Sequence, residues 1–121
     1  MEEASDKKHY ALFFDIDGTL VSFKTHEIPA STIFALTQAK ANGHKVYIAT
    51  GRPIVIITNL GAIDYLIDGY ITTNGSYCFV RKDAVCCTPI PKKAVEKVVG
   101  DAQQKGYSLV VIGKRDVAVL D

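Results

Sequence analysis

Apolar residues in the first two thirds of the chain fall into short runs, separated by stretches that mix apolar and polar positions. The run "HYALFF" is apolar without alternation, which is typical of a strand covered on both faces in a parallel sheet. "HKVYIA" and "GYITT" indicate two further strands. We therefore expect three strands, at residues 9–14, 44–49 and 69–73.

The stretches between these runs carry helix signals. Ser31 can cap a helix after the first strand, and Gly43 suits the end of that helix. Pro53 can occupy the first turn of another helix, which would run to about Leu60. Strands that alternate with helices predict right-handed crossover units and a parallel sheet covered on both sides. The expected fold class is α/β, with a Rossmann-like parallel sheet built from the first three strands.

The pattern changes in the last third of the chain. Short strands are expected around a turn at residues 81–84, and two prolines mark the exit from this segment. A helix is expected at residues 92–105, followed by two final strands. We therefore expect residues 1–89 to form a βαβ core and residues 90–121 to begin a second α+β unit.

Composition removes several classes of function. The 121 residues are 48% hydrophobic and 22% charged, as in an ordinary globular chain of about one domain. Fourteen Lys and Arg against thirteen Asp and Glu give a net charge of +1, so no electrostatic field favours nucleic acid or an anionic membrane. The apolar runs are shorter than the roughly 20 residues of a membrane span, and the first ten residues lack the apolar stretch of a signal peptide. A cytoplasmic protein is expected.

The three cysteines show no zinc-binding spacing. They are odd in number, two are adjacent, and there is no C-x-x-C pair. We expect Cys78, Cys86 and Cys87 to be buried or half-buried free thiols.

Two carboxylates stand at the end of the first predicted strand. Asp15 falls at the carboxyl end, where open parallel sheets bind ligands, and Asp17 lies in the loop beside Gly18. Carboxylates this close repel unless a cation lies between them or one holds a proton. Mg²⁺ prefers such oxygen ligands and can bridge a carboxylate to a phosphate. Asp15 could then attack phosphorus, and Asp17 could give and take the protons.

The end of the second predicted strand offers groups that bind phosphate. Thr50 supplies a hydroxyl, and the backbone N–H groups of Gly51 and Arg52 stand near a predicted helix N-terminus. The Arg52 guanidinium adds a charged donor for phosphate or for the polar part of a substrate. Asn74, before Gly75, is expected in a turn, and a substrate contact is its second possible role.

Three segments together resemble a known family. "FFDIDGTL" is similar to the first motif of the haloacid dehalogenase (HAD) superfamily, "YIATGR" to the second, and "YITTNGSY" resembles its Cof-like branch of Mg²⁺-dependent sugar-phosphate phosphatases with a large α/β cap. The resemblance implies that Asp15 is the nucleophile and a metal ligand. It makes Asp17 the general acid and base, which binds the metal through its carbonyl. It also makes Thr50 the phosphate-binding hydroxyl and Thr19 a supporting residue.

The chain departs from the family in length. Members of this branch continue through the rest of the cap to a third motif with a lysine and a fourth, acidic motif, and neither is visible here. Asp101 lies within a helical pattern, and Lys114 lies between two predicted strands. We therefore expect an N-terminal portion of a longer phosphatase, with residues 90–121 as the start of the cap. Alone, it should be nearly inactive and should form a dimer or a larger aggregate through the surfaces left open.

Two other classes of function stay open. A phosphoacceptor signalling domain also has an Asp at a strand end, but it usually has its acceptor at the third strand, where "YITTNG" offers none. A non-catalytic protein that binds Mg²⁺ or phosphate is the other alternative. The expected partner in each reading is a small phosphorylated molecule, with no nucleic acid and no membrane.

Overall fold

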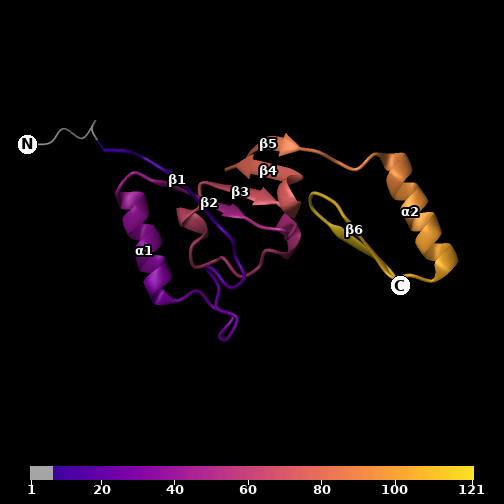
Figure 1. Ribbon diagram of the computed structural model, residues 1–121, viewed down its shortest axis with the longest axis horizontal. Helices are drawn as coiled ribbons and strands as arrows, with labels where there is room; N and C mark the ends of the chain where they lie inside the picture. Colours follow the sequence, from indigo (N-terminus) through magenta and orange to yellow (C-terminus); the bar gives the residue numbers. More distant parts are fainter. Residues whose placement is uncertain (1–6) are drawn as a thin grey trace, which may run out of the picture.

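The computed structural model describes residues 7–121 and contains two groups of elements joined by an extended segment (Figure 1). The strands are β1 (Ala11–Phe14), β2 (Lys45–Ala49), β3 (Gly69–Thr72), β4 (Tyr77–Val80), β5 (Asp83–Cys87), β6 (Leu109–Ile112) and β7 (Val117–Leu120). The α-helices are α1 (Ala30–Ala41) and α2 (Lys92–Lys105). Three short 3₁₀ turns are η2 (Ile54–Ile56), η3 (Asp64–Leu66) and η4 (Thr73–Gly75).

The first five strands form one sheet in the order β1-β2-β3-β4-β5. β1, β2 and β3 run parallel, and β4 and β5 are added as antiparallel strands. The register sets Phe14 beside Ile48, and Ile48 beside Tyr70, so the three parallel strands end at one edge of the sheet. The predicted α/β class and the three predicted strands are confirmed.

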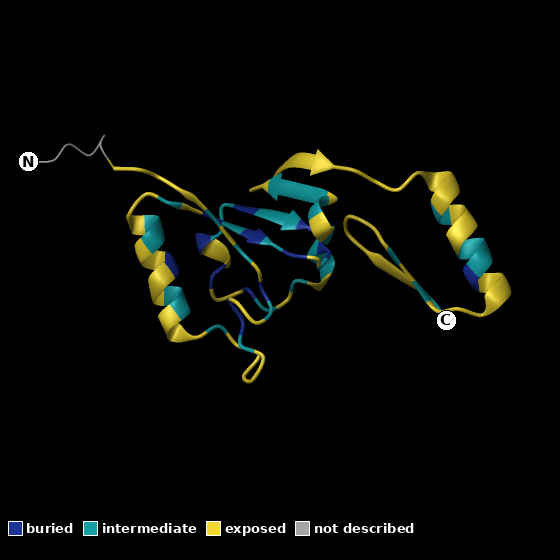
Figure 2. Cartoon of the chain, viewed as in Figure 1, coloured by how far each residue is buried: buried dark blue, intermediate teal, exposed yellow. Residues whose placement is uncertain are grey.

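One face of this sheet is packed and the other is open (Figure 2). α1 and the 54–66 segment cover the packed face, where the buried core consists of Ile16, Leu20, Val21, Leu36, Val46, Ile48, Leu60, Ile63 and Leu66. On the opposite face, Phe13 stacks on Tyr47 with ring centroids 5.0 Å apart and is 55% exposed. The prediction of a sheet covered on both faces was therefore wrong for this chain, because its crossover segments lie on the same side.

Two helix predictions need correction. α1 begins at Ala30 after Pro29, and Ser31 lies in the first turn, so Ser31 does not cap the helix. The backbone carbonyl of Pro29 accepts the N–H groups of Thr32 and Ile33 instead. After Pro53 the chain forms only the 3₁₀ turn η2, because the β-branched run that follows loses side-chain freedom in a helix.

The C-terminal group consists of α2 and the β6–β7 hairpin, which forms its own two-stranded sheet. α2 has the predicted bounds, and Gly106 follows it as the C-cap with a φ of 70°, the left-handed conformation that favours glycine at a helix end. The turn of the hairpin reaches back toward the first sheet, where the Lys114 ammonium lies 5.7 Å from the ring centroid of Tyr77. Among residues 7–121, no helix has both the length and the apolar content needed to cross a bilayer.

Candidate active site

Asp15 follows β1 directly and opens a tight turn. Its Oδ1 accepts the backbone N–H of Ile16 at 2.8 Å. The Ile16 side chain is fully buried, and its carbonyl accepts the N–H groups of Thr19, Leu20 and Val21 at 3.2, 3.0 and 3.0 Å. This anchored turn holds the exposed Asp15 carboxylate at the edge of the sheet, and among residues 7–121 only its Oδ1 accepts a hydrogen bond.

Gly18 closes the same turn. Its N–H donates to the Val21 carbonyl at 2.8 Å, and its φ of 79° lies in the left-handed region. Within residues 7–121, no hydrogen bond of this turn ends on the Asp17 carbonyl, which is therefore available as an oxygen ligand. Glycine at position 18 therefore allows a turn conformation that other residues adopt only with strain.

Arg52 connects the second strand end to the first. Its Nε donates to Asp17 Oδ2 at 2.9 Å and its Nη2 to Asp17 Oδ1 at 2.7 Å, which makes a bidentate ion pair. Its Nη1 also donates to the carbonyl of Ile56 at 3.2 Å. Both partners are about one third exposed, with side-chain values of 32% for Arg52 and 39% for Asp17, so a solute can reach the pair.

Thr50 forms a corner at the end of β2. Its N–H donates to the Ile71 carbonyl at 2.9 Å, and its Oγ1 accepts the N–H of Arg52 at 3.0 Å. Because the hydroxyl oxygen acts as acceptor in that bond, its own hydrogen stays free to donate. Thr50 is only 8% exposed, so this hydroxyl is held firmly in place.

The η4 turn packs against the Thr50 corner. The N–H of Asn74 donates to the Thr50 carbonyl at 3.2 Å, and Asn74 has a φ of 53°. A Cβ on Gly51 would lie 2.9 Å from Asn74 Oδ1, so a larger residue at this position would require the Asn74 side chain to move. The N–H of Thr73, a residue that the sequence analysis did not single out, donates to the Arg52 carbonyl at 3.1 Å. Its only sequence signal is its position before the Asn-Gly pair.

Most of the site residues that the sequence indicated lie at the carboxyl ends of the parallel strands. They are Asp15, Asp17, Thr50, Gly51, Arg52 and Asn74. Thr19 belongs to the same turn, but it lines a separate cavity of about 300 Å³ against α1. The roles of these residues stay predictions.

The oxygen donors at this edge are compatible with Mg²⁺. Within the described part of the chain, no group of three or more His, Cys, Asp or Glu side chains could hold a metal ion. The Asp15 carboxylate and the Asp17 carbonyl both present hard oxygens at this edge. Mg²⁺ commonly uses one or two carboxylates together with water and phosphate oxygens, so this partial set fits it.

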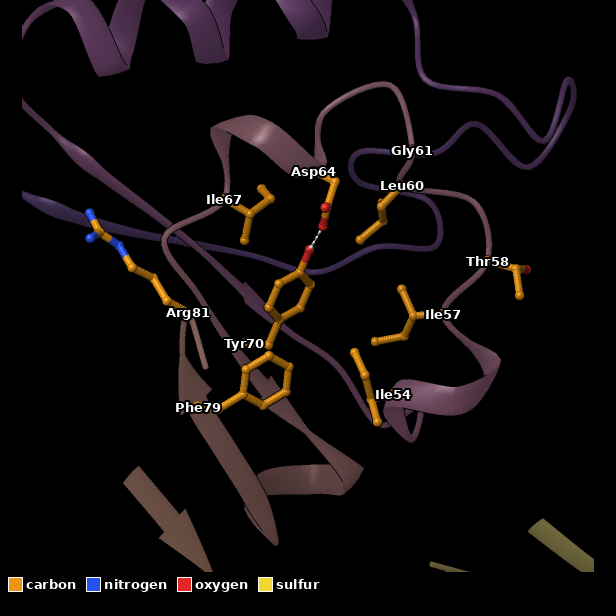
Figure 3. A pocket seen from close by; sticks show the side chains of 10 residues that line it. All are labelled: Ile54, Ile57, Thr58, Leu60, Gly61, Asp64, Ile67, Tyr70, Phe79 and Arg81. Atoms are coloured by element: carbon orange, nitrogen blue, oxygen red, sulfur yellow. Dashed lines mark hydrogen bonds between the residues drawn. The ribbon is translucent and has the colours of Figure 1, made fainter. Parts of the chain in front are cut away.

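A larger cavity, of about 600 Å³, lies on the packed face and contains none of the predicted site residues (Figure 3). Tyr70 stacks on Phe79 with centroids 5.2 Å apart, and its hydroxyl donates to Asp64. Burial raises the pKa of the Tyr70 hydroxyl, and the hydrogen bond and charge of Asp64 raise it further. Tyr70 therefore stays a neutral donor here, which suits a structural role.

The profile of the haloacid dehalogenase-like hydrolases matches residues 12–121. The chain therefore belongs to this family, and the predicted resemblance is confirmed.

The chain is also similar to solved structures of HAD phosphatases and to a bacterial relative. The HAD subclass IIB sugar phosphatase BT4131 is 49% identical with a TM-score of 0.83, over 91% of this chain and 43% of that one. BT1666 from Bacteroides thetaiotaomicron, studied among HAD phosphatases, is 30% identical with a TM-score of 0.76, over 98% of this chain and 44% of that one. YkrA of Bacillus subtilis is 28% identical over 104 residues, 85% of this chain and 39% of that protein. The chain thus spans about two fifths of the length of these relatives.

Proposed function

We propose that this chain carries the nucleophile and the acid–base group of a Mg²⁺-dependent phosphomonoester hydrolase that acts through an aspartyl phosphate. The observation that supports this most is the exposed Asp15 carboxylate at the end of β1, with Asp17 held by Arg52 two residues further on. The parallel register brings the Thr50 corner to the neighbouring strand end. A nucleophile, a proton carrier and phosphate-binding groups are then available at one edge.

Asp15 is the nucleophile in this proposal. Its Oδ1 is occupied by the Ile16 N–H, which leaves Oδ2 to form the bond to phosphorus. The bond between phosphorus and the ester oxygen breaks, and Asp17 gives its proton to that oxygen as the alcohol leaves. Water then attacks the aspartyl phosphate, Asp17 takes the proton of that water, and phosphate leaves with the Asp15 carboxylate restored.

The Thr50 corner would bind the transferred phosphoryl group. The hydroxyl of Thr50 can donate to a phosphoryl oxygen while it accepts the Arg52 N–H. The backbone N–H of Gly51 is a second donor. Asn74, beside Gly51, is assigned to the polar part of the substrate.

Arg52 would regulate the availability of Asp17. A bidentate guanidinium favours the charged carboxylate, whereas the first step needs a proton on Asp17. Two oxygens of a substrate phosphate can accept the paired hydrogen bonds of the Arg52 guanidinium, as the two carboxylate oxygens of Asp17 do. We infer that substrate phosphate competes for the guanidinium and loosens the ion pair before the proton is transferred.

Mg²⁺ would be held by the Asp15 carboxylate and the Asp17 carbonyl. When bound, it supplies positive charge that offsets the repulsion between an anionic nucleophile and an anionic substrate.

The proposed substrates are small phosphorylated metabolites, with sugar phosphates first. Support for sugar phosphates comes from BT4131, which is described as a sugar phosphatase and is 49% identical to this chain. The net charge of +1 gives no reason to expect a polyanionic partner.

Turnover of p-nitrophenyl phosphate by the purified 121-residue chain, with and without Mg²⁺, tests the proposal. We expect slow Mg²⁺-dependent hydrolysis that Asp15→Asn abolishes, because an amide is a poor nucleophile. Circular dichroism should be unchanged in this variant, since Asp15 is exposed. Hydrolysis by Asp15→Asn within about tenfold of wild type would overturn the assignment. Labelling by acetyl phosphate without turnover would instead indicate a phosphoacceptor, and binding of phosphate without either would indicate a non-catalytic protein.

A further inference from the structure

Two cysteines face each other across the β4–β5 hairpin. The register pairs Cys78 directly with Cys86, beside an irregularity where the pairing shifts between Cys78 and Phe79. Directly opposed residues of antiparallel strands have Cα atoms about 4.5–5.5 Å apart, and a disulfide needs about 4.4–6.8 Å. The backbone therefore already has the spacing of a cross-strand disulfide.

The two thiols differ in access. Cys78 is half-buried, and its Sγ donates to the Gly75 carbonyl at 3.5 Å. The edge strand β5 is exposed along its length (Figure 2), and Cys86 is one of its exposed residues. The Sγ of Cys86 lies 3.7 Å from Thr88 Oγ1. The expectation of buried or half-buried thiols was thus wrong for Cys86, because β5 is the edge strand and no element among residues 7–121 pairs with its outer side.

Cys87 provides an internal comparison. It is also exposed, but its cross-strand partner is Tyr77, so it points away from the Cys78–Cys86 pair along a strand whose side chains alternate between faces. The expectation that Cys87 is covered was wrong for the same reason as for Cys86. The three free thiols therefore consist of one opposed pair and one isolated cysteine.

We propose that Cys78 and Cys86 form an oxidisable dithiol site whose reactant is a peroxide. Cys86, the accessible partner, attacks a peroxide oxygen as its thiolate, so the O–O bond breaks and Cys86 becomes a sulfenic acid. Cys78 then attacks the Cys86 sulfur, the S–O bond breaks and hydroxide leaves. With hydrogen peroxide, the two thiols lose two electrons and two protons, and the products are one disulfide and two waters.

The environment of Cys78 supports this order of events. Burial raises the pKa of its thiol, and the neighbouring Cys86 raises it further. A thiol that is half-buried and reluctant to ionise is disfavoured as the first nucleophile, which leaves that role to Cys86. In the second step the Cys86 sulfur is already adjacent, and the proton of Cys78 passes to the hydroxide that leaves. During this step Cys78 gives up its contact with Gly75, the last residue of the η4 turn.

The experiment treats the reduced, folded chain with hydrogen peroxide and then blocks the remaining thiols. We expect the number of free thiols to fall from the three of the sequence to one, with loss of the mass of two hydrogens and no change in oligomeric state. Trypsin cleaves after Arg81 and Lys82, which separates Cys78 from Cys86. The disulfide should therefore join the peptides 46–81 and 83–92.

Matched serine variants identify the partners. Cys87→Ser should form the link at a rate within about twofold of wild type, whereas Cys86→Ser and Cys78→Ser should not form an intramolecular link. In guanidinium chloride, Cys78 should link to Cys86 and Cys87 without selectivity, because the register is lost. A link from Cys78 to Cys87 in the folded chain, a disulfide between two chains, or oxygen addition with no link would overturn the proposal.

Discussion

Arg52 donates two parallel hydrogen bonds to the carboxylate of Asp17, at 2.9 Å from Nε and 2.7 Å from Nη2. The two residues are 35 positions apart and follow neighbouring strands of the sheet. This ion pair therefore joins the two segments that resemble the first and second motifs of the family. It also fixes the direction of the carboxylate that we assign to proton transfer.

Arg52→Lys tests the importance of this geometry. Lysine keeps the charge but cannot donate paired hydrogen bonds, so it would orient neither the Asp17 carboxylate of the free chain nor the substrate phosphate that displaces it. We expect Mg²⁺-dependent turnover of p-nitrophenyl phosphate to fall by about 10- to 100-fold, equivalent to roughly 1.4–2.8 kcal/mol of barrier. The control is Arg115→Lys in the exposed β6–β7 turn, which should turn over like wild type. Equal rates for the two variants would show that only the charge of Arg52 matters.

Gly51→Ala tests the close approach of η4 to the Thr50 corner. The added Cβ would lie 2.9 Å from Asn74 Oδ1 and should displace Asn74 from its present position. We expect the affinity for inorganic phosphate with Mg²⁺, measured by calorimetry, to fall by about tenfold, or roughly 1.4 kcal/mol. Gly61→Ala is a matched control, because a Cβ there meets no atom within 4 Å. Unchanged affinity of Gly51→Ala for phosphate would show that the Thr50 corner is not part of the phosphate-binding site.

Asp68 is expected to stabilise the packing of α1 on the sheet. Its Oδ2 accepts the ammonium of Lys40 at 2.6 Å and the N–H of Val46 at 2.8 Å, and its side chain is 12% exposed. Asp68→Asn should lower the free energy of unfolding by about 1–3 kcal/mol at pH 7, measured with urea. Asp101→Asn, which breaks an exposed pair with Lys97, should cost about 0.5 kcal/mol or less. Equal decreases in the free energy of unfolding for Asp68→Asn and Asp101→Asn would contradict this role of Asp68.

The contribution of Asp68 should depend on pH. Burial alone would raise the pKa of its carboxyl, but the hydrogen bonds from Lys40 and Val46 and the charges of Lys40 and Lys45 together lower it below the ordinary 3.8. A lowered folded-state pKa means that the stabilisation is complete above the unfolded value and is lost as the pH falls through the folded one. Wild type should therefore approach the stability of Asp68→Asn only below about pH 4. A difference that persists unchanged at lower pH would exclude a charge effect.

The sequence predicted some elements well because their signals are local. The apolar runs predicted the three parallel strands, and α2 has the bounds expected from its apolar face, residues 92–105. The carboxyl ends of parallel strands meet at one edge of a sheet, and this was sufficient to predict that Asp15 and Thr50 lie at neighbouring strand ends.

Other features depend on contacts between distant segments. The pairing of Arg52 with Asp17 could not be predicted, because side-chain direction after a strand depends on the turn that follows it. The helix expected after Pro53 is only a 3₁₀ turn, because a proline that suits a helix start does not offset the low helix propensity of the β-branched residues that follow it. The opposition of Cys78 and Cys86 depends on a one-residue shift in the β4–β5 register, which no local pattern encodes.

The most direct test of the central claim is to locate the phosphoryl group on the chain. The protein is mixed with p-nitrophenyl phosphate and Mg²⁺, quenched, and reduced with borohydride, which converts an aspartyl phosphate to homoserine. The tryptic peptide 9–24 contains both Asp15 and Asp17, so fragmentation distinguishes them. We predict homoserine at position 15 in wild type, its loss without Mg²⁺, and none in Asp15→Asn. Homoserine at position 17, or at position 15 in equal amount without phosphate ester, would contradict the assignment of Asp15 as the nucleophile.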